Sequence, residues 1–159
     1  MGKENGDFEI KATVLGSFRK AKLEIDLAIE ELRDNKINVL GPAIGSVILP
    51  RRGDLYFPYS HFAPLASEQG MAPEEVEKLF IEKCVTQSDF VLVVNPNEYI
   101  GEMVSYEMQI ADSGGITIYS QEPIQIANAK IPNELALRVK NLPIRDIVRI
   151  EKEARIPRR

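Results

Sequence analysis

Five consecutive apolar residues, at positions 90–94, constrain the fold of this chain more than any other feature of its sequence. A strand that is buried on one face alternates apolar and polar residues, whereas this segment, Phe-Val-Leu-Val-Val, has no polar position. Strands that are covered on both faces are typical of parallel sheets, in which helices pack on each side. We therefore expect residues 89–94 to form a central parallel strand.

The segments on both sides of this strand alternate between strand and helix patterns. Strands are expected at residues 10–15, 37–40, 47–49 and 116–119, and helices at residues 20–35, 72–86, 101–112 and 131–140, with residues 144–154 compatible with either. This alternation predicts an α/β fold, a flavodoxin- or Rossmann-like three-layer sandwich with a mostly parallel sheet of four or five strands. The irregular stretch from residue 41 to residue 71 is long enough to act as a lid or a binding loop.

The size and composition of the chain suit a single domain. With 159 residues, of which 44% are hydrophobic, the chain can bury a sizeable core. We assign residues 9–154 to one α/β domain, residues 1–8 to a flexible N-terminus and residues 155–159 to a basic tail in solvent. Because no apolar stretch reaches the ~20 residues of a membrane span and no secretory signal is present, we expect a cytoplasmic protein with no membrane partner.

Charge and rare residues argue against several classes of function. Twenty lysines and arginines against 24 acids give a net charge of −4, so the chain has no general attraction to a nucleic acid polymer. The single cysteine, Cys84, excludes a disulfide framework and a thiolate metal cluster, and its apolar surroundings predict a small buried thiol. The single histidine, His61, favours a packing or surface role because no nucleophile motif or zinc-ligand set accompanies it. We therefore expect no metal and no cofactor.

A candidate anion site lies where the first strand meets the first helix. Ligands of open α/β sheets bind beyond the carboxyl ends of the strands, at the point where the strand order reverses. The turn Gly16-Ser17-Phe18-Arg19 combines free N–H groups and a helix dipole with a hydroxyl and a guanidinium, which suit a phosphate. The turn has neither the P-loop nor the dinucleotide glycine pattern. The alternative is that Ser17 caps the helix while Arg19 is solvated.

Two glutamates occupy the helix that follows the central strand. Before this helix, Gly101 permits a close approach of the backbone to a ligand. Glu107 comes five residues after Glu102, a rotation of about 140° beyond one full turn, so the two carboxylates do not share a helix face. One of them can point towards the edge of the sheet, where a carboxylate kept ionised by the helix dipole would suit a nucleophile. The alternative is that both are solvated acids near the helix start.

The stretches VLGSFRKA and SDFVLVVNPNEYIGEMVSYEMQIADSGGITIY carry a resemblance to a known family. The first is similar to the first strand and the glycine-serine turn of the nucleoside 2-deoxyribosyltransferase-like superfamily, which includes the 2-deoxynucleoside 5-monophosphate N-glycosidases. The second is similar to that family's central strand, its loop, its glutamate-bearing helix and its next strand. Together with the order of the elements, the resemblance covers roughly residues 10–120.

The resemblance implies an N-glycosidase or deoxyribosyltransferase-like enzyme that cleaves the N-glycosidic bond of a nucleotide or nucleoside. Glu107 matches the family's catalytic glutamate, which attacks the anomeric carbon so that the base leaves and water or a second base resolves the intermediate. Ser17 and Arg19 match the phosphate-binding turn of the members that hydrolyse monophosphates. Further candidates for substrate contacts are Gly16, Phe18, Asn95, Asn97, Gly101 and Ser105, and candidates for a second acid are Glu82, Glu98 and Glu102. The family also implies a homo-oligomer.

The sequence departs from the family pattern at two places, which keeps a second function open. Ile81, with Glu82 beside it, stands where the family has an aspartate, and Asp89 starts its strand and therefore lies at the opposite edge of the sheet. Residues 103–106, Met-Val-Ser-Tyr, are bulkier than the corresponding segment of the transferases. A non-catalytic nucleotide-binding or sensor module of the same fold is therefore the alternative. A receiver-like signalling domain is disfavoured because it needs an acidic pair after its first strand.

Overall fold

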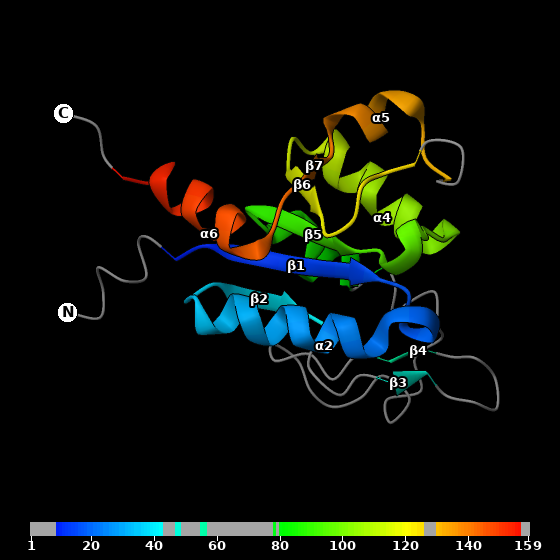
Figure 1. Ribbon diagram of the computed structural model, residues 1–159, viewed down its shortest axis with the longest axis horizontal. Coiled ribbons are helices and arrows are strands. Elements are labelled where there is room, and N and C mark those ends of the chain that lie inside the picture. Colours follow the sequence, from blue (N-terminus) through cyan, green and yellow to red (C-terminus); the bar gives the residue numbers. More distant parts are fainter. Residues whose placement is uncertain are drawn as a thin grey trace.

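A computed structural model describes the chain at residues 9–42, 47–48, 55–56, 78, 80–125 and 130–156 (Figure 1). The strands are β1 (Lys11–Gly16), β2 (Asn38–Gly41), β3 (Val47–Ile48), β4 (Leu55–Tyr56), β5 (Phe90–Val94), β6 (Thr117–Ser120) and β7 (Lys140–Asn141). The helices are α2 (Phe18–Asp34), α4 (Glu102–Ser113), α5 (Asn133–Arg138) and α6 (Ile144–Glu153), with 3₁₀ turns η2 (Val85–Gln87) and η3 (Pro96–Glu98). Residues 78 and 80–83 are also helical. None of the helices within these ranges is long and apolar enough to cross a bilayer.

Five strands form one parallel sheet in the order β2-β1-β5-β6-β7. β5 lies at its centre, between β1 and β6, and all five of its residues are buried, as the apolar run predicts. The chain runs from β1 outwards to β2, then returns to β5 and continues through β6 to β7. The strand order therefore reverses between β1 and β5.

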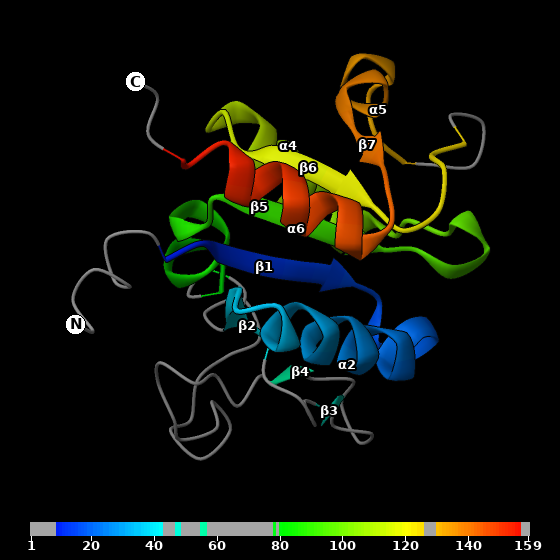
Figure 2. The ribbon, with the colours of Figure 1, turned by 60° about the vertical axis from the view of Figure 1, so that its left-hand side comes forward.

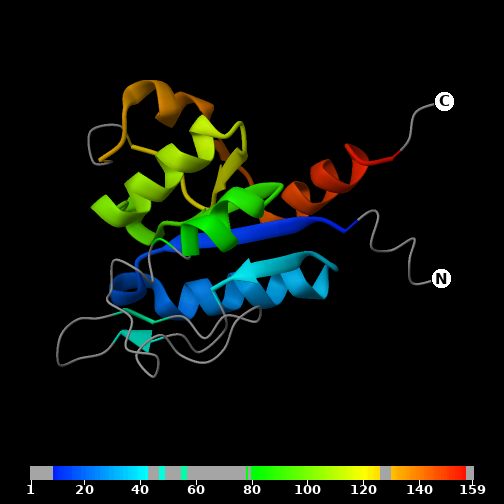
Figure 3. The same cartoon turned by 180° about the vertical axis from the view of Figure 1, so that it is seen from behind.

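Two apolar clusters join the sheet to its helices and complete a three-layer Rossmann-like α/β fold. Successive strand residues point to opposite faces, so Leu92 packs towards α2 and α6, whereas Val93 packs towards α4, α5 and residues 80–84. Figure 2 shows α2 and α6 over the first face, and Figure 3 shows α4 and the helical residues near 80 over the second. The buried stripe of α2 consists of Ala21, Ile25, Ala28, Ile29 and Leu32, which the helical periodicity of the sequence predicts.

The predicted elements between residues 10 and 41 and between residues 89 and 120 are confirmed, with small shifts at their ends. Residues 144–154, compatible with either structure in the sequence, form helix α6. The two-residue strand β7 was not predicted, because its exposed residues carry no apolar alternation. β3 confirms the strand expected at 47–49, but it pairs antiparallel with β4 rather than joining the main sheet. Residues 1–8, most of the predicted loop, and residues 72–77 and 79 of the helix predicted at 72–86 lie outside the described residues.

A polar cluster holds α6 on the sheet. The Tyr119 O–H group donates to Glu151 Oε2 at 2.5 Å, and Arg155 Nη1 donates to Glu151 Oε1 at 3.0 Å. Arg155 Nη2 lies 3.3 Å from Asp89 Oδ1, and Asp89 also accepts a backbone N–H group of β1, which confirms its position at the amino edge of the sheet. The prediction of a solvated tail is wrong at Arg155, whose side chain is only 27% exposed because it packs into this cluster. Residues 157–159 lie outside the described part of the chain.

Candidate functional site

The reversal of strand order brings the turn after β1 and the loop after β5 to the same point of the sheet edge. Gly16, the last residue of β1, pairs with Val94, the last residue of β5. A Cβ atom at Gly16 would lie 2.9 Å from Ile25 Cδ1 and 3.1 Å from the carbonyl oxygen of Val94, so only glycine lets α2 pack this closely. This edge is where open α/β sheets bind their ligands.

Ser17 begins α2 but does not cap it with its side chain. Its backbone is extended (φ −85°, ψ 115°), and its carbonyl oxygen accepts the N–H groups of Lys20 and Ala21 at 3.1 and 2.7 Å. Among the described groups, the Ser17 hydroxyl makes no capping hydrogen bond, so the capping alternative is wrong. The side chains of Phe18 and Arg19 lie outside the described part of the structure, and their roles as phosphate contacts stay predictions.

Asn95 has a structural role at this edge. Its side chain is fully buried and contacts the backbone of Glu122, beyond the end of β6, at two points. Nδ2 donates to the carbonyl oxygen of Glu122 at 3.1 Å, and Oδ1 accepts the N–H group of Glu122 at 2.9 Å. These two bonds tie the carboxyl ends of β5 and β6 together and so fix the loop on which the other candidate residues lie.

A left-handed turn brings the loop after β5 back towards α2. Asn97 and Glu98 have φ values of 59° and 62°, a conformation that asparagine adopts more readily than glutamate. Tyr99 follows, 40% exposed, and the Lys20 Nζ atom lies 4.8 Å from the centroid of its ring. This cation–π contact joins the two loops of the edge. Neither Lys20 nor Tyr99 is among the predicted site residues, although both lie inside the motifs VLGSFRKA and NEYIGE.

Gly101 makes room for the same tyrosine. It precedes α4 in an extended conformation (φ −84°, ψ 178°), and its carbonyl oxygen accepts the N–H group of Ser105 at 2.9 Å. A Cβ atom at Gly101 would lie 2.9 Å from Tyr99 Oη. The sequence predicts a close approach of a ligand here, whereas in the structure the group that approaches is the Tyr99 hydroxyl.

Glu107 is a buried carboxylate in the middle of α4, with 4% of its surface exposed. It flanks the buried stripe of this helix, which includes Met108 and Ala111. Cys84 is close enough to feel the charge of Glu107: burial first, and then that charge, raise the pKa of the Cys84 thiol to about 12. Cys84 is fully buried, as predicted, and its Sγ donates to the carbonyl oxygen of Leu40 at 3.5 Å. Glu107 therefore lies near Cys84 and the carboxyl half of β2.

Ser105 lies on the other flank of α4. Positions 105 and 107 differ by about 200° around a helix. The Ser105 hydroxyl donates to the carbonyl oxygen of Lys130 and accepts from Gln109 Nε2, the latter at 3.1 Å. The buried stripe of α4 therefore separates Ser105 from Glu107, and the structure does not bring these two predicted site residues together.

The candidates for a second acid are less buried than Glu107. Glu102, in the first turn of α4, and Glu82, in the helical residues 80–83, are exposed, and Glu98 is half-buried in the left-handed turn. Ile81, at the position of the family's aspartate, packs into the apolar cluster on the α4 face. Within the described residues, no second buried carboxylate accompanies Glu107 on this face of the sheet.

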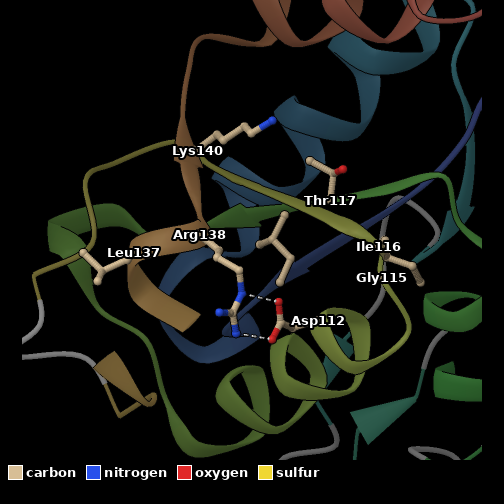
Figure 4. Close-up of a pocket in the computed structure, with 8 residues that line it drawn as sticks. Asp112, Gly115, Ile116, Thr117, Leu137, Arg138 and Lys140 are labelled. Atoms are coloured by element: carbon tan, nitrogen blue, oxygen red, sulfur yellow. Dashed lines mark hydrogen bonds and ion pairs between the residues drawn. The ribbon is translucent and has the colours of Figure 1, made fainter. Parts of the chain in front are cut away.

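A separate groove opens at the amino end of β6 (Figure 4). Its volume is about 620 Å³, and it is lined by Asp112, Gly115, Ile116, Thr117, Ile118, Leu137, Arg138 and Lys140. Arg138 Nε and Nη2 donate to the two carboxylate oxygens of Asp112 at 2.9 and 2.6 Å, and these bonds hold the pKa of Asp112 below its ordinary value. Gly16 and Asn95 lie at the carboxyl ends of parallel strands, whereas Thr117 and Lys140, which line the groove, begin theirs, so the groove and the candidate site lie at opposite edges of the sheet.

Comparisons with known proteins support the fold of this chain but do not indicate an activity. No protein-family model matches the chain, and no curated protein sequence matches it significantly. A crystal structure of a conserved protein from Enterococcus faecalis V583 is similar to 93% of this chain and 99% of that one, with a TM-score of 0.55 and 16% sequence identity. At this identity the similarity shows the three-layer α/β fold alone. Within the described residues, no group of three or more histidines, cysteines or acids is arranged to hold a metal ion.

Proposed function

We propose that this protein is an N-glycosidase or deoxyribosyltransferase-like enzyme that cleaves the N-glycosidic bond of a nucleotide or nucleoside, with Glu107 as the nucleophile. The observation that carries the proposal is the burial of Glu107, which is 4% exposed on the helix that starts where the strand order reverses. Burying a carboxylate is costly, and such groups cluster at functional sites. The resemblance of the segment around Glu107 to the glutamate-bearing helix of the deoxyribosyltransferases supplies the reaction.

In the proposed reaction, a carboxylate oxygen of Glu107 attacks the anomeric carbon of the sugar. The bond to the base nitrogen breaks, and its electron pair passes to the base, which takes up a proton from water or from a second acid. Water then attacks the glycosyl ester, so that the sugar is released with retained configuration and the carboxylate is restored. Transfer to a second base would replace water in this last step.

The contact between Lys20 and Tyr99 supports a nucleotide as the ligand. The two side chains place a cation and an aromatic ring, 4.8 Å apart, at the edge where such folds bind ligands. A half-exposed tyrosine ring can stack on a base, and an ammonium group attracts a phosphate. The turn at Ser17 and Arg19, which resembles the family's phosphate-binding turn, begins α2 beside this pair.

The experiment that tests the proposal measures free base. Purified protein is incubated with a panel of deoxynucleoside monophosphates and deoxynucleosides, and the products are separated by chromatography. Glu107→Gln should abolish base release because an amide is not nucleophilic, whereas Glu134→Gln, at an exposed position of α5, should retain it. Thermal unfolding of both variants verifies that they are folded. Base release that continues unchanged in Glu107→Gln contradicts the assignment of the nucleophile.

A non-catalytic nucleotide-binding module is the second candidate, and Ile81 favours it. This residue replaces the acid of the family and is 9% exposed in an apolar cluster, so no charge stands at that position. Such a module would bind a nucleoside monophosphate in titration calorimetry while the wild-type protein releases no base from the whole panel. Base release that depends on Glu107 would exclude this candidate.

A further inference from the structure

The groove at the amino end of β6 lies beside a strand that β7 covers only in part. β7 begins opposite Tyr119, so no residue of β7 lies opposite Thr117 or Ile118, the first two residues of β6. On their other side, both residues pair with β5. Thr117 and Ile118 also line the groove. The uncovered side of β6 is therefore one wall of the groove.

The N–H group of Ile118 points to this uncovered side. In a parallel strand, the main-chain groups of successive residues point to opposite neighbours. The N–H group of Gln121 donates to the carbonyl oxygen of Val93, in β5, at 3.0 Å. Ile118 lies three residues earlier, so its N–H group points away from β5. The register leaves no β7 acceptor for it among the described residues, although Ile118 is only 4% exposed. A buried N–H group needs an acceptor, so the groove favours a ligand that supplies an oxygen there.

Lys140 supplies a cation beside this donor. It is the first residue of β7 and lies in register with Tyr119, so its side chain points to the same face as that of Thr117. Figure 4 shows Lys140 and Thr117 on one side of β6. Lys140 is exposed and forms no ion pair with any residue that the structure describes. An ammonium group, a hydroxyl and a main-chain N–H group together favour an anion.

The other cation of the groove is paired. Arg138 donates from Nε and Nη2 to the two carboxylate oxygens of Asp112. These hydrogen bonds first, and then the charges of Asp112 and Glu134, raise the pKa of the Arg138 guanidinium. Glu134 does not line the groove, and its charge acts on Arg138. Among the lining residues, Arg138 and Asp112 compensate each other and Lys140 leaves one positive charge, which matches a monoanion.

Apolar side chains complete the lining. Ile116 is half-buried, and Leu137, 77% exposed, is the most exposed large hydrophobic side chain in the described part of the chain. The fold leaves this leucine in water, so an apolar group that covers it gains free energy. The groove volume of about 620 Å³ lies within the roughly 300–1,000 Å³ of small-molecule sites. The groove therefore combines an anion subsite with an apolar surface of ligand size.

We propose that this groove is a second binding site and that it takes a small monocarboxylate with an apolar body. One carboxylate oxygen accepts the N–H group of Ile118, and the other pairs with the ammonium group of Lys140. The apolar body lies against Ile116 and Leu137. The ion pair between α4 and α5 forms a wall beside the ligand. This inference does not rest on the proposed function, because the groove and the candidate site lie at opposite edges of the sheet.

A titration of the full chain with 4-phenylbutyrate, followed by nuclear magnetic resonance, tests the proposal. The probe has about twelve non-hydrogen atoms, and at ordinary ligand efficiency its dissociation constant should be on the order of 1–10 mM. The amide signals of Gly115, Thr117 and Ile118 should shift and saturate. The Ile118 amide proton should move downfield, because it gains a charged acceptor.

Related probes separate the head group from the body. The neutral 4-phenylbutyramide lacks the charge, and acetate lacks the apolar body, so each should bind at least about threefold more weakly than 4-phenylbutyrate. Phenyl phosphate, a dianion, should also bind more weakly, since the lining leaves one positive charge. Tighter binding of phenyl phosphate than of 4-phenylbutyrate would contradict the assignment of a monocarboxylate.

Variants test the assigned contacts. Lys140→Gln should raise the dissociation constant of 4-phenylbutyrate by about three- to tenfold, and Leu137→Ser by about threefold. The matched controls are Lys22→Gln and Leu23→Ser, the latter at one of the two exposed leucines of α2, and both should leave it unchanged. All four positions are exposed, and thermal unfolding verifies that the variants are folded. Shifts that do not saturate, shifts confined to residues outside the groove, or an unchanged dissociation constant in Lys140→Gln would overturn the inference.

Discussion

Tyr119→Phe measures how strongly a single hydrogen bond fixes α6 to the sheet. The Tyr119 ring is 1% exposed and meets the Phe90 ring edge-on, at a centroid distance of 5.5 Å. Its O–H group donates to the carboxylate of Glu151, itself 7% exposed, at 2.5 Å. The substitution removes the hydroxyl and keeps the ring, so it isolates this bond. Hydrogen bonds to charged groups contribute about 1.5–3 kcal/mol. Because Glu151 retains Arg155 at 3.0 Å, we expect the free energy of unfolding to fall by about 2 kcal/mol.

Urea and thermal unfolding, followed by circular dichroism, provide the assay. For a domain of this size, about 2 kcal/mol corresponds to a decrease in Tm of roughly 4–8 °C. The matched control is Tyr106→Phe, which removes the hydroxyl of a tyrosine that is 56% exposed on α4. This control should change the free energy of unfolding by less than about 0.5 kcal/mol. If Tyr119→Phe unfolds like the control, the hydrogen bond to Glu151 does not contribute and the reasoning is refuted.

The pH dependence of the same variant gives a second measurement. Burial first, and then the hydrogen bond to Glu151, raise the pKa of the Tyr119 phenol above its ordinary value. A raised pKa means that the folded state holds the proton more tightly than the unfolded state does. The contribution of Tyr119 is therefore complete below about pH 10, the ordinary pKa of tyrosine, and is lost as the pH rises further. The stability curves of the wild type and of Tyr119→Phe should approach each other above that pH.

Three further predictions concern the core and the sheet edge. Because the fold raises the pKa of Cys84 from 9.0 to about 12, the contribution of Cys84 to stability should fall by about 2–3 kcal/mol between pH 9 and pH 11, and urea titrations of Cys84→Ala should show a fall smaller than that of the wild type by about this amount. Gly16→Ala should lower the free energy of unfolding by about 1–3 kcal/mol, since its Cβ would lie 3.1 Å from the backbone oxygen of Val94. A denaturation midpoint equal to that of the wild type would mean that the backbone around Val94 shifts at no cost. Asn95→Ala should cost about 1–2 kcal/mol and speed amide hydrogen exchange at Glu122, whose N–H group loses its acceptor; protection equal to the wild type would argue against this tether.

The candidate site was predictable in its position and less so in its detail. Strand–helix alternation and the apolar run of β5 place Gly16 and Asn95 at one edge, and the structure confirms this because parallel strands share their carboxyl ends. The sequence could not show that the Asn95 amide would bond to Glu122, 27 residues later in the chain. Nor could it show that Tyr99 would turn back towards Lys20, since that depends on φ values above zero in the residues before it.

Helical spacing alone separated Glu102 from Glu107, but it left open which of them would be buried. The number of residues between two helix positions sets the angle between their side chains, which for Glu102 and Glu107 is about 140° beyond one full turn. The packing of α4 on the sheet then selects the buried side, and it placed Glu107 beside Cys84 while Glu102 remained in solvent. That selection depends on partners far away in the chain, so no local pattern contains it.

The sequence by itself determined the fold class of this protein, because the periods of apolar residues specify strands and helices, and an uninterrupted apolar strand must be covered on both faces. It also determined that Cys84 would be a buried thiol. Only the tertiary structure decided that Ser17 leaves its helix uncapped, that Arg155 packs against Glu151 and Asp89, and that α2 turns two leucines outwards. The reason is physical: side-chain partners of this kind are chosen by distances in space, and the periodicity of a chain records only which side of its own helix or strand a residue occupies.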